Sequence, residues 1–193
     1  MEEKKIPTFE ERMAILTAPF KEPKWRIQSR SPKGKPTRCN VMPYVDARMV
    51  QERFDAAFGA DNWQNTYDPE TGSASISVRV DGEWITKSDV GVESMADKEK
   101  GKASSAFKRA AVLWGVGRDL YRLGIKTLSL DNKGEDPIVE NGIILKNAVA
   151  ISNYMNKISE SVGLLYQLWN LNKDKWEDSE FKDLFIKMKK YVE

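Results

Sequence analysis

The sequence predicts an α+β protein built on an antiparallel β-sheet meander, followed by an alanine-rich helix that can lie close against a sheet. Three observations lead to this fold class. Residues 73–80 alternate between apolar and polar side chains, Asp81-Gly82 follows as a two-residue turn, and residues 103–114 form an alanine-rich helical pattern. The chain has 193 residues, of which 40% are hydrophobic, so it is long enough to enclose a core.

Before the meander, the sequence predicts a short helix and an N-terminal β-hairpin. Residues 6–20 carry apolar side chains at helical spacing. Residues 24–30 and 37–44 are the two strands of the hairpin. The basic loop 31–36 joins them, since its two prolines and one glycine cannot sustain a β-ladder.

A second helix leads into the meander. Residues 45–58 repeat apolar side chains every three or four positions and are followed by Gly59, which predicts an amphipathic helix and its end. The first strand of the meander starts within residues 63–67. The Asp81-Gly82 turn then sets the register of the next two strands, and it pairs Val80 with Glu83, Arg79 with Trp84, and Val78 with Ile85.

The alanine-rich helix that follows the meander has an apolar stripe and a polar side. The stripe is formed by Ala103, Ala106, Phe107, Ala110, Leu113 and Trp114. Lys108 and Arg109 lie on or near the other side, and the small side chains of Ala110 and Ala111 would let the helix approach a sheet closely. Gly115 and Gly117 end this helix.

The remainder predicts a helical C-terminal segment. Residues 118–123 form a short turn or helix, residues 131–136 a polar linker, and residues 138–192 two or three helices. We therefore expect a core at residues 1–130 and a helical segment at residues 131–193, docked on the core or on a neighbouring subunit. The last helix carries an apolar face suited to docking within its own chain, formed by Phe181, Leu184, Phe185 and Met188.

Composition excludes several classes of enzyme. The chain has no histidine, which removes Ser-His-Asp and Cys-His catalysis and every zinc site that uses histidine. The phosphate-binding patterns GxxxxGK[ST] and GxGxxG after a strand are also absent, which argues against an ATP-driven motor or a nicotinamide enzyme. We expect no cofactor, and carboxylate-bound magnesium is the catalytic option still open.

Cysteine content and hydropathy point to a soluble protein of the cytoplasm, bacterial if a phage encodes it. The single cysteine, Cys39, cannot form an internal disulfide, and we expect it to be a buried small apolar side chain rather than a nucleophile. The sequence has no apolar stretch of about 18 to 20 residues, and its first residues lack the apolar core of a signal peptide.

Positive charge is concentrated in two blocks, although the net charge is only +2. Residues 21–48 hold eight positive and two negative side chains, and residues 102–126 hold six and one. Residues 49–101 between them hold five positive and eleven negative side chains. If folding joins the two blocks, they form a basic stripe of the kind that binds a phosphate backbone; otherwise they are solvated faces.

Within the second block, Lys108 and Arg109 are adjacent on a helix whose other side is apolar. Such a helix would present two cations to phosphates on a rigid platform, and Arg118, Arg122 and Lys126 extend the positive charge beyond it. The alternative is an ordinary solvated helix face. Trp84 also fits two interpretations, a cross-strand packing partner of Arg79 or a platform on which a base stacks.

Three segments in sequence order resemble the Rad52 superfamily, most closely its Sak-type phage single-strand annealing proteins. They are YVDARMVQERFDAAFGADNW at residues 44–63, SDVGVES at 88–94, and GKASSAFKRAAVLWGVGRDLY at 101–121. The resemblance covers about half of the chain, from Trp25 to Leu123. It implies a β-β-β-α core with a helix packed across the sheet. It also implies that the subunits form a closed ring, with single-stranded DNA in a basic groove around it.

The resemblance also implies which residues contact DNA. Lys108 and Arg109 fall on the family's Lys-Arg pair, and Arg30 falls on a further arginine of the groove. Val112 stands where the family often has another basic residue, and Arg118 or Lys102 is the candidate to compensate. Lysines that could form a second, outer DNA contact are Lys33, Lys35, Lys98, Lys100 and Lys102.

The expected function is therefore ATP-independent binding and annealing of complementary single strands in homologous recombination and double-strand break repair, without enzymatic bond chemistry. Expected partners are single-stranded DNA and further copies of the chain, with a single-strand-binding protein or a recombinase as further candidates. One alternative is a protein that coats strands or loads a recombinase without annealing. Another is a magnesium-dependent nuclease that uses Asp89, Glu93 and Asp97.

Overall fold

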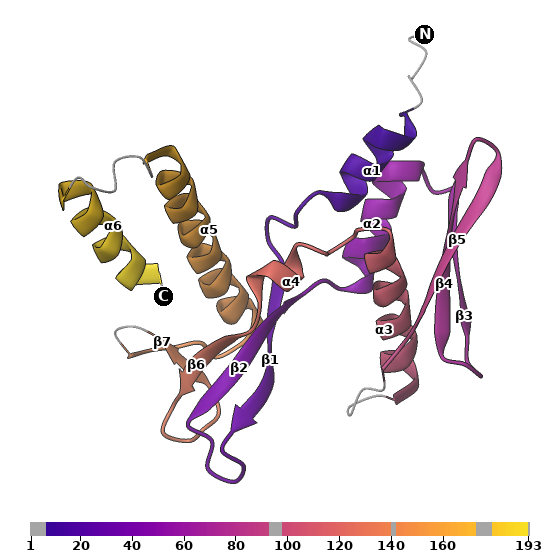
Figure 1. Ribbon diagram of the computed structural model, residues 1–193. Coiled ribbons are helices and arrows are strands. Elements are labelled where there is room, and N and C mark those ends of the chain that lie inside the picture. The colour runs from indigo at the N-terminus through magenta and orange to yellow at the C-terminus, as the bar shows by residue number, and fades with distance from the viewer. Residues whose placement is uncertain (1–6, 93–97, 140–141, 173–178, 193) are drawn as a thin grey trace. The chain divides into compact units, whose positions relative to one another are not determined.

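A computed structural model describes residues 7–92, 98–139, 142–172 and 179–192 (Figure 1). The chain divides into two compact units, and each is formed by two separate stretches of sequence. We call residues 1–20 and 44–122 the α3 unit, and residues 21–43 and 123–193 the α5 unit. Each unit contains one antiparallel β-sheet, so the predicted α+β class with antiparallel sheets is confirmed.

The sheet of the α3 unit has three strands in the order β3-β4-β5. They are β3 (Trp63–Asp68), β4 (Ser73–Val80) and β5 (Glu83–Val90). The turn between β4 and β5 has positive φ angles at Asp81 (50°) and Gly82 (90°), as a tight hairpin requires. The predicted pairs of Arg79 with Trp84 and of Val78 with Ile85 are confirmed, and the same register extends to Ser73 and Val90.

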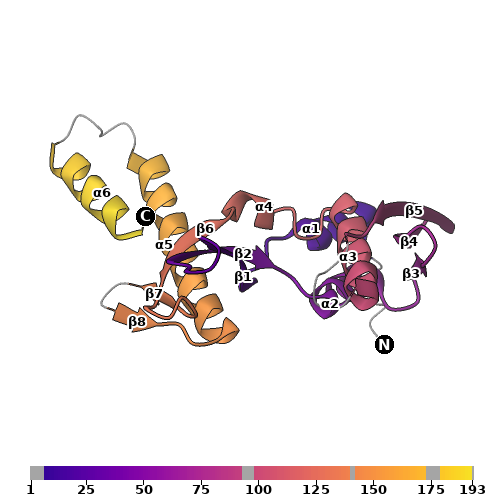
Figure 2. The same ribbon diagram turned by 90° about the horizontal axis from the view of Figure 1, so that it is seen from below.

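One face of this sheet is covered by helices. Helix α3 (Lys98–Leu113) contacts all three strands, and α2 (Ala47–Phe58) lies on the same side, packed against α1 (Phe9–Thr17) (Figures 1 and 2). Side chains on alternate positions of β4 point into this layer. The buried core consists of Leu16, Val45, Val50, Phe54, Ala57, Phe58, Ala74, Ile76, Val78, Ala106, Phe107, Ala110, Ala111, Trp114 and Val116.

The ends of α1 and α2 are set by local side chains. Thr8 accepts a hydrogen bond from the backbone of Glu11, whose side chain accepts one from the backbone of Thr8, so the two form a capping box. Asp46 caps α2 by accepting from the Met49 amide, and Gly59 ends that helix with a φ of 77°. Leu113 corrects one prediction for α3, because it is exposed rather than part of the apolar stripe.

The opposite face of the three-stranded sheet is polar. Two hydroxyl pairs join β4 to β5 there, Ser75 with Ser88 at 2.7 Å and Ser77 with Thr86 at 2.8 Å. Arg79 follows on the same face, and its Nε donates to the Gly82 carbonyl oxygen at 3.4 Å. The Trp84 side chain is 44% exposed, so neither interpretation of this tryptophan is decided.

The α5 unit contains a five-stranded sheet in the order β1-β2-β6-β7-β8. The predicted hairpin forms its first two strands, β1 (Lys24–Ser31) and β2 (Arg38–Tyr44). Strands β6 (Lys126–Leu130), β7 (Pro137–Val139) and β8 (Ile143–Ile144) complete the sheet. The buried core contains Trp25, Cys39, Val41, Leu130, Val139, Leu145, Ile151 and Met155.

Helix α5 (Ala148–Asn172) packs along β1 and covers the face of this sheet that carries the buried core (Figure 2). The indole Nε1 of Trp25 donates to Asn156 Oδ1 at 2.8 Å, and Asn156 Nδ2 donates to the Pro23 carbonyl oxygen at 3.1 Å. Helix α6 (Ser179–Val192) packs on α5, where the Trp169 and Phe185 rings lie 5.2 Å apart. Of the predicted docking face, Phe185 makes this contact, whereas Met188 is exposed.

The segment after residue 125 corrects the predicted architecture. Residues 126–144 form three short strands that extend the N-terminal hairpin, where the sequence had predicted a linker followed by helices. These strands span only five, three and two residues, too short for periodicity to reveal. The hairpin therefore shares a sheet with the C-terminal segment, and the division at residue 130 into a DNA-binding core and an appendage stays a functional prediction.

Candidate nucleic-acid interface

Three of the predicted DNA-binding cations lie along α3. Lys102, Lys108 and Arg109 occupy its middle, so about 10 Å of helix separates the first from the last. Lys102 and Lys108 are half-buried, and the Arg109 side chain is 46% exposed. The buried side chains of Ala106, Phe107 and Ala110 hold this part of the helix against the sheet. The backbone that carries the cations is therefore rigidly placed.

Two glycines bring α3 close to the sheet near Lys102. A Cβ atom on Gly91 would lie 2.1 Å from the Lys102 carbonyl oxygen, so only glycine fits at this crossing. A Cβ atom on Gly72 would lie 2.0 Å from Lys102 Cε, which shows that the lysine stem crosses the turn between β3 and β4. The Lys102 ammonium therefore lies beside the turn between β3 and β4.

Arg109 forms an ion pair with Asp89 of β5. Its Nε lies 3.4 Å from Asp89 Oδ2, and its Nη2 donates to Asp89 Oδ1 at 3.4 Å. These are long contacts for a bidentate pair, and the arginine is almost half exposed, so the guanidinium keeps donors that face solvent. In the register of the sheet Asp89 lies opposite Ala74, on the face that α3 covers.

Arg118 lies at the C-terminal end of α3. Its Nε donates to the Val112 carbonyl oxygen at 2.9 Å, and its Nη2 donates to the Leu113 carbonyl oxygen at 3.0 Å. The side chain is exposed. An arginine therefore stands at the helical turn where Val112 replaces the basic residue that the Rad52 resemblance leads one to expect.

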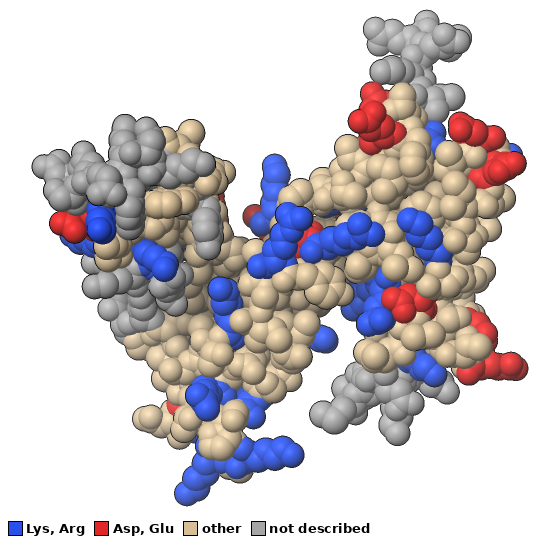
Figure 3. All heavy atoms as spheres, viewed as in Figure 1, with Lys and Arg blue, Asp and Glu red and all other residues tan. Residues whose placement is uncertain are grey.

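The remaining predicted cations belong to the α5 unit. Arg30 is exposed near the end of β1, and its Nη2 donates to the Glu135 carbonyl oxygen at 3.0 Å. Lys33 and Lys35 are exposed in the loop between β1 and β2. Lys and Arg side chains gather on this hairpin end, whereas Asp and Glu side chains gather at the turn ends of the three-stranded sheet (Figure 3).

Cys39 is a core side chain, as predicted. It is free and 1% exposed, and burial raises the pKa of its thiol, an effect that Arg30 and a backbone hydrogen bond with Leu128 partly oppose. A thiol whose pKa is raised is less ionised and less nucleophilic at neutral pH.

Two carboxylates of the described residues, Asp68 and Asp131, hold local turns. Asp68 accepts from Thr71 and from the Glu70 amide, and these hydrogen bonds lower the pKa of its carboxyl. Asp131 accepts from the backbone of Glu135 and Lys133, which likewise lowers its pKa. No group of three potential metal ligands occurs in the described part of the chain. Of the three nuclease candidates, Asp89 is paired with Arg109, and Glu93 and Asp97 lie outside the described residues.

The side chains of Lys98 and Lys100, two candidates for an outer DNA contact, likewise lie outside the described residues. Among the helices described, none is long and apolar enough to span a lipid bilayer.

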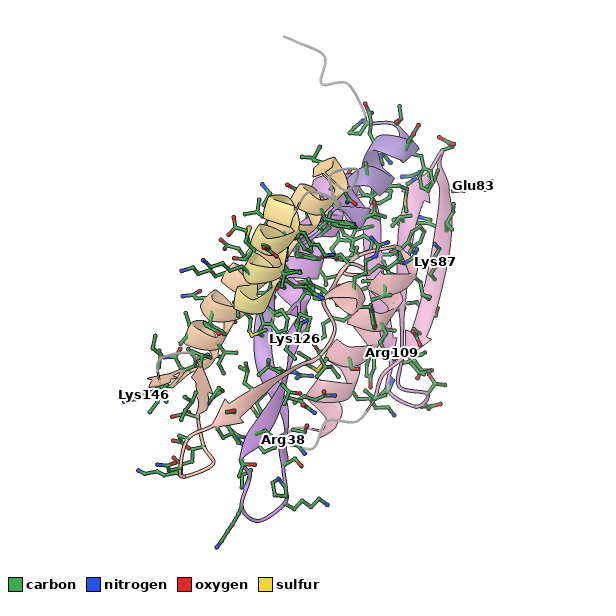
Figure 4. The ribbon with its side chains drawn as sticks, turned by 60° about the vertical axis from the view of Figure 1, so that its left-hand side comes forward. Arg38, Glu83, Lys87, Arg109, Lys126 and Lys146 are labelled. Atoms are coloured by element: carbon green, nitrogen blue, oxygen red, sulfur yellow. The ribbon has the colours of Figure 1, made fainter. Side chains whose placement is uncertain are left out.

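The structure adds one cation that the sequence analysis missed. The Lys87 Nζ of β5 donates to the Leu113 carbonyl oxygen at 3.0 Å and lies 4.1 Å from the centre of the Trp114 ring. Figure 4 shows Lys87 and Arg109 on the side where α3 meets β5. The signal was available, because extending the register from Asp81-Gly82 pairs Lys87 with Ile76, a residue of the apolar face.

Comparison with known proteins identifies the family. Two proteins named single-stranded DNA-binding protein DdrA are similar, at 33% identity over 105 residues in Deinococcus radiodurans and 30% over 106 residues in Deinococcus deserti. These alignments cover 52% and 53% of this chain and 50% and 52% of the relatives, so the chain spans about half the length of the curated relatives it matches. No solved structure matches.

A family model described as the Rad52/22 family double-strand break repair protein matches residues 9–137. This range is about two thirds of the chain. It includes the whole sheet of the α3 unit, the cation-bearing helix α3 and the hairpin of the α5 unit. The chain belongs to the Rad52/22 family.

Proposed function

We propose that this chain binds single-stranded DNA along α3 and promotes annealing of complementary strands without ATP, in recombination and double-strand break repair. The observation that carries the proposal is the Lys108-Arg109 pair on a helix packed rigidly against a sheet, in a chain of the Rad52/22 family. The DdrA relatives are named single-stranded DNA-binding proteins, which supports single-stranded DNA as the ligand.

The mechanism requires no covalent step, because base pairing supplies the free energy of annealing. Cations on α3 would neutralise phosphates and release counterions, which lowers the repulsion between two strands. Contacts to phosphates carry no sequence information, so binding should depend little on sequence. Bases left free of the protein could then test a second strand.

The proposal includes assembly into a homo-oligomeric ring, which would hold many nucleotides extended at once and multiply weak contacts. Within the described residues, β3 and β5 are edge strands of a three-stranded sheet. Edge strands have unpaired backbone groups that a second copy of the chain can bind.

Two other functions remain as alternatives to annealing. A strand-coating or recombinase-loading protein would use the same cations but would not accelerate duplex formation. A magnesium-dependent nuclease would require Asp89 as a ligand, and its pairing with Arg109 argues against that role.

The deciding experiment measures how fast two complementary dye-labelled oligonucleotides form a duplex, with and without protein, in EDTA and without nucleotide. We expect acceleration by the wild type and none by a variant that lacks the charges at positions 108 and 109. Binding without acceleration would favour the coating protein. Cleavage that requires magnesium and is lost in Asp89→Asn would favour the nuclease.

A further inference from the structure

Two cations from distant parts of the α3 unit converge on one carbonyl oxygen. Lys87 Nζ and Arg118 Nη2 each donate to the Leu113 oxygen at 3.0 Å, so the two nitrogens are no more than twice that distance apart. Lys87 comes from β5, and Arg118 follows the glycine-rich turn after α3. Like charges this close repel each other unless an anion lies nearby.

The helix end itself cannot balance these charges. The C-terminal end of a helix carries about half of one negative elementary charge, and a single cation there is enough to complement it. Lys87 and Arg118 together bring two positive charges, so a clear excess remains.

Neighbouring carboxylates do not remove this excess. Neither Lys87 nor Arg118 makes an ion pair with any of the residues that the structure describes. Asp119 follows Arg118 directly but forms no ion pair with Arg118 or Lys87; its Oδ2 accepts from the Phe20 amide. Asp89, on the same face of β5 as Lys87, is paired with Arg109.

Both cations are held in place before any ligand arrives. The Lys87 ammonium lies over the buried Trp114 ring, and that ring is itself anchored by a hydrogen bond from its Nε1 to the Ile76 carbonyl oxygen at 3.2 Å. Two hydrogen bonds to consecutive carbonyl oxygens hold the Arg118 guanidinium, which is exposed. Little side-chain entropy is then lost when an anion binds.

We propose that Lys87 and Arg118 form a composite phosphate site at the C-terminal end of α3, which takes one phosphate of a bound DNA strand. This inference rests on the proposed DNA binding. It adds Lys87 to the interface and gives the strand a further contact beyond the α3 cations Lys102, Lys108 and Arg109. The pair supplies at this turn the positive charge that Val112 does not.

The test compares Lys87→Gln, Arg118→Gln and the double variant for binding of a labelled oligodeoxythymidylate over a range of salt concentrations. We expect each single variant to bind about fivefold more weakly, the size of a solvent-exposed ion pair. Because both cations bind the same phosphate, the double variant should lose less affinity than the product of the two single-variant losses. Its logarithmic salt slope should fall by about 0.7, the value for one neutralised phosphate on a single strand.

Arg79→Gln is the matched control. Arg79 also donates to a backbone carbonyl oxygen and is exposed, but it lies on the polar face of the same sheet, and no second cation of the described residues donates to that oxygen. Its affinity and salt slope should equal those of the wild type. The variant Lys87→Arg/Arg118→Lys keeps both charges and should keep most of the affinity.

The outcomes separate this site from the proposed function. A wild type that does not bind the oligonucleotide would refute DNA binding. The site would then be judged by whether inorganic tripolyphosphate raises the melting temperature of the wild type but not of the double variant. If the wild type binds and the double variant binds equally well, the site is wrong. An equal loss in the charge-retaining variant would also refute it, because the two side chains would then act only by supporting the helix end.

Discussion

The two units place positive charge in different ways. In the α3 unit Lys102, Lys108 and Arg109 lie on α3 and Arg118 follows it. Protein acceptors hold two of these side chains, because Arg109 pairs with Asp89 and Arg118 donates to the Val112 oxygen. In the α5 unit the lysines Lys33 and Lys35 are exposed in the hairpin loop, and Arg30 lies near the end of β1, where it donates to the Glu135 carbonyl oxygen. The predicted DNA-binding cations of the α3 unit thus lie on α3 or just after it, whereas those of the α5 unit lie on the hairpin.

The difference between the held arginines of the α3 unit and the loop lysines of the hairpin separates pre-organised from adaptable contacts. A cation whose charged group is already hydrogen-bonded loses little rotamer freedom when it binds a phosphate. A loop lysine can lose side-chain entropy equivalent to about 2 kcal/mol. We therefore expect the α3 unit to provide most of the affinity for DNA and the α5 unit to add weaker contacts.

The largest expected effect comes from the double variant Lys108→Ala/Arg109→Ala. Removing two charge-assisted contacts should weaken binding of single-stranded DNA by about 100-fold or more and abolish accelerated annealing. Alanine favours helix, and neither side chain belongs to the buried core, so folding and assembly should persist. Fluorescence anisotropy measures affinity, and sedimentation checks assembly. Unchanged affinity in an assembled variant would contradict the placement of DNA on α3.

The next effect tests whether the two units unfold independently of each other. Gly91→Ala forces a Cβ atom to within 2.1 Å of the Lys102 carbonyl oxygen, and overpacking of this kind costs about 1–3 kcal/mol. Asn156→Ala leaves the buried Trp25 indole without its acceptor, which costs about 1–3 kcal/mol in the other unit. Hydrogen exchange should show faster opening of β4 in the first variant and of β1 in the second. Equal exchange changes in both units for each variant would mean that they unfold together.

A smaller effect is expected in the hairpin. Arg30→Gln should weaken single-strand binding by about tenfold, the loss of one charge-assisted contact. Lys146→Gln is the matched control, because Lys146 is also exposed and lies two residues after β8, the opposite edge of the same sheet (Figure 4). Equal losses in both variants would mean that the α5 unit acts only through its overall charge.

The smallest effect concerns the acid beside the main cation pair. Asp89 must share Arg109 with an incoming phosphate, so Asp89→Asn should raise affinity by about threefold at low salt. Glu83→Gln removes the same charge from the same strand at its other end and should change affinity less. In the Arg109→Gln background the gain from Asp89→Asn should disappear. Persistence of the gain would show that Asp89 acts through the general field instead.

Much of the α3 unit was predictable because its signals are local. The alternation of residues 73–80 and the Asp81-Gly82 turn gave the pairing of Arg79 with Trp84, since a tight turn determines which residues face each other. The alanine-rich stripe placed Ala106 and Ala110 against the sheet. Leu113 was assigned to that stripe incorrectly, because helical periodicity does not show where the covering layer ends.

The α5 unit was less predictable because its sheet depends on distant pairing. Cys39 of β2 faces Leu128 of β6, almost 90 residues later in the chain, and no periodicity reports such a partner. Strands of two or three residues, such as Ile143–Ile144, are likewise stable only because neighbouring strands already exist. The sequence therefore suggested helices where the structure has strands.

By itself the sequence determined the α+β class, the hairpin register, the cation pair at 108 and 109 and the burial of Cys39. Each of these follows from residue type and near-neighbour spacing. Only the tertiary structure decided that Asp89 pairs with Arg109 and that Lys87 meets Arg118 on the Leu113 oxygen. Asp89 and Arg109 are 20 positions apart in the sequence, and Lys87 and Leu113 are 26 apart. Residue spacing shows which face of a strand or helix a side chain occupies, but it does not show which distant neighbour that side chain contacts.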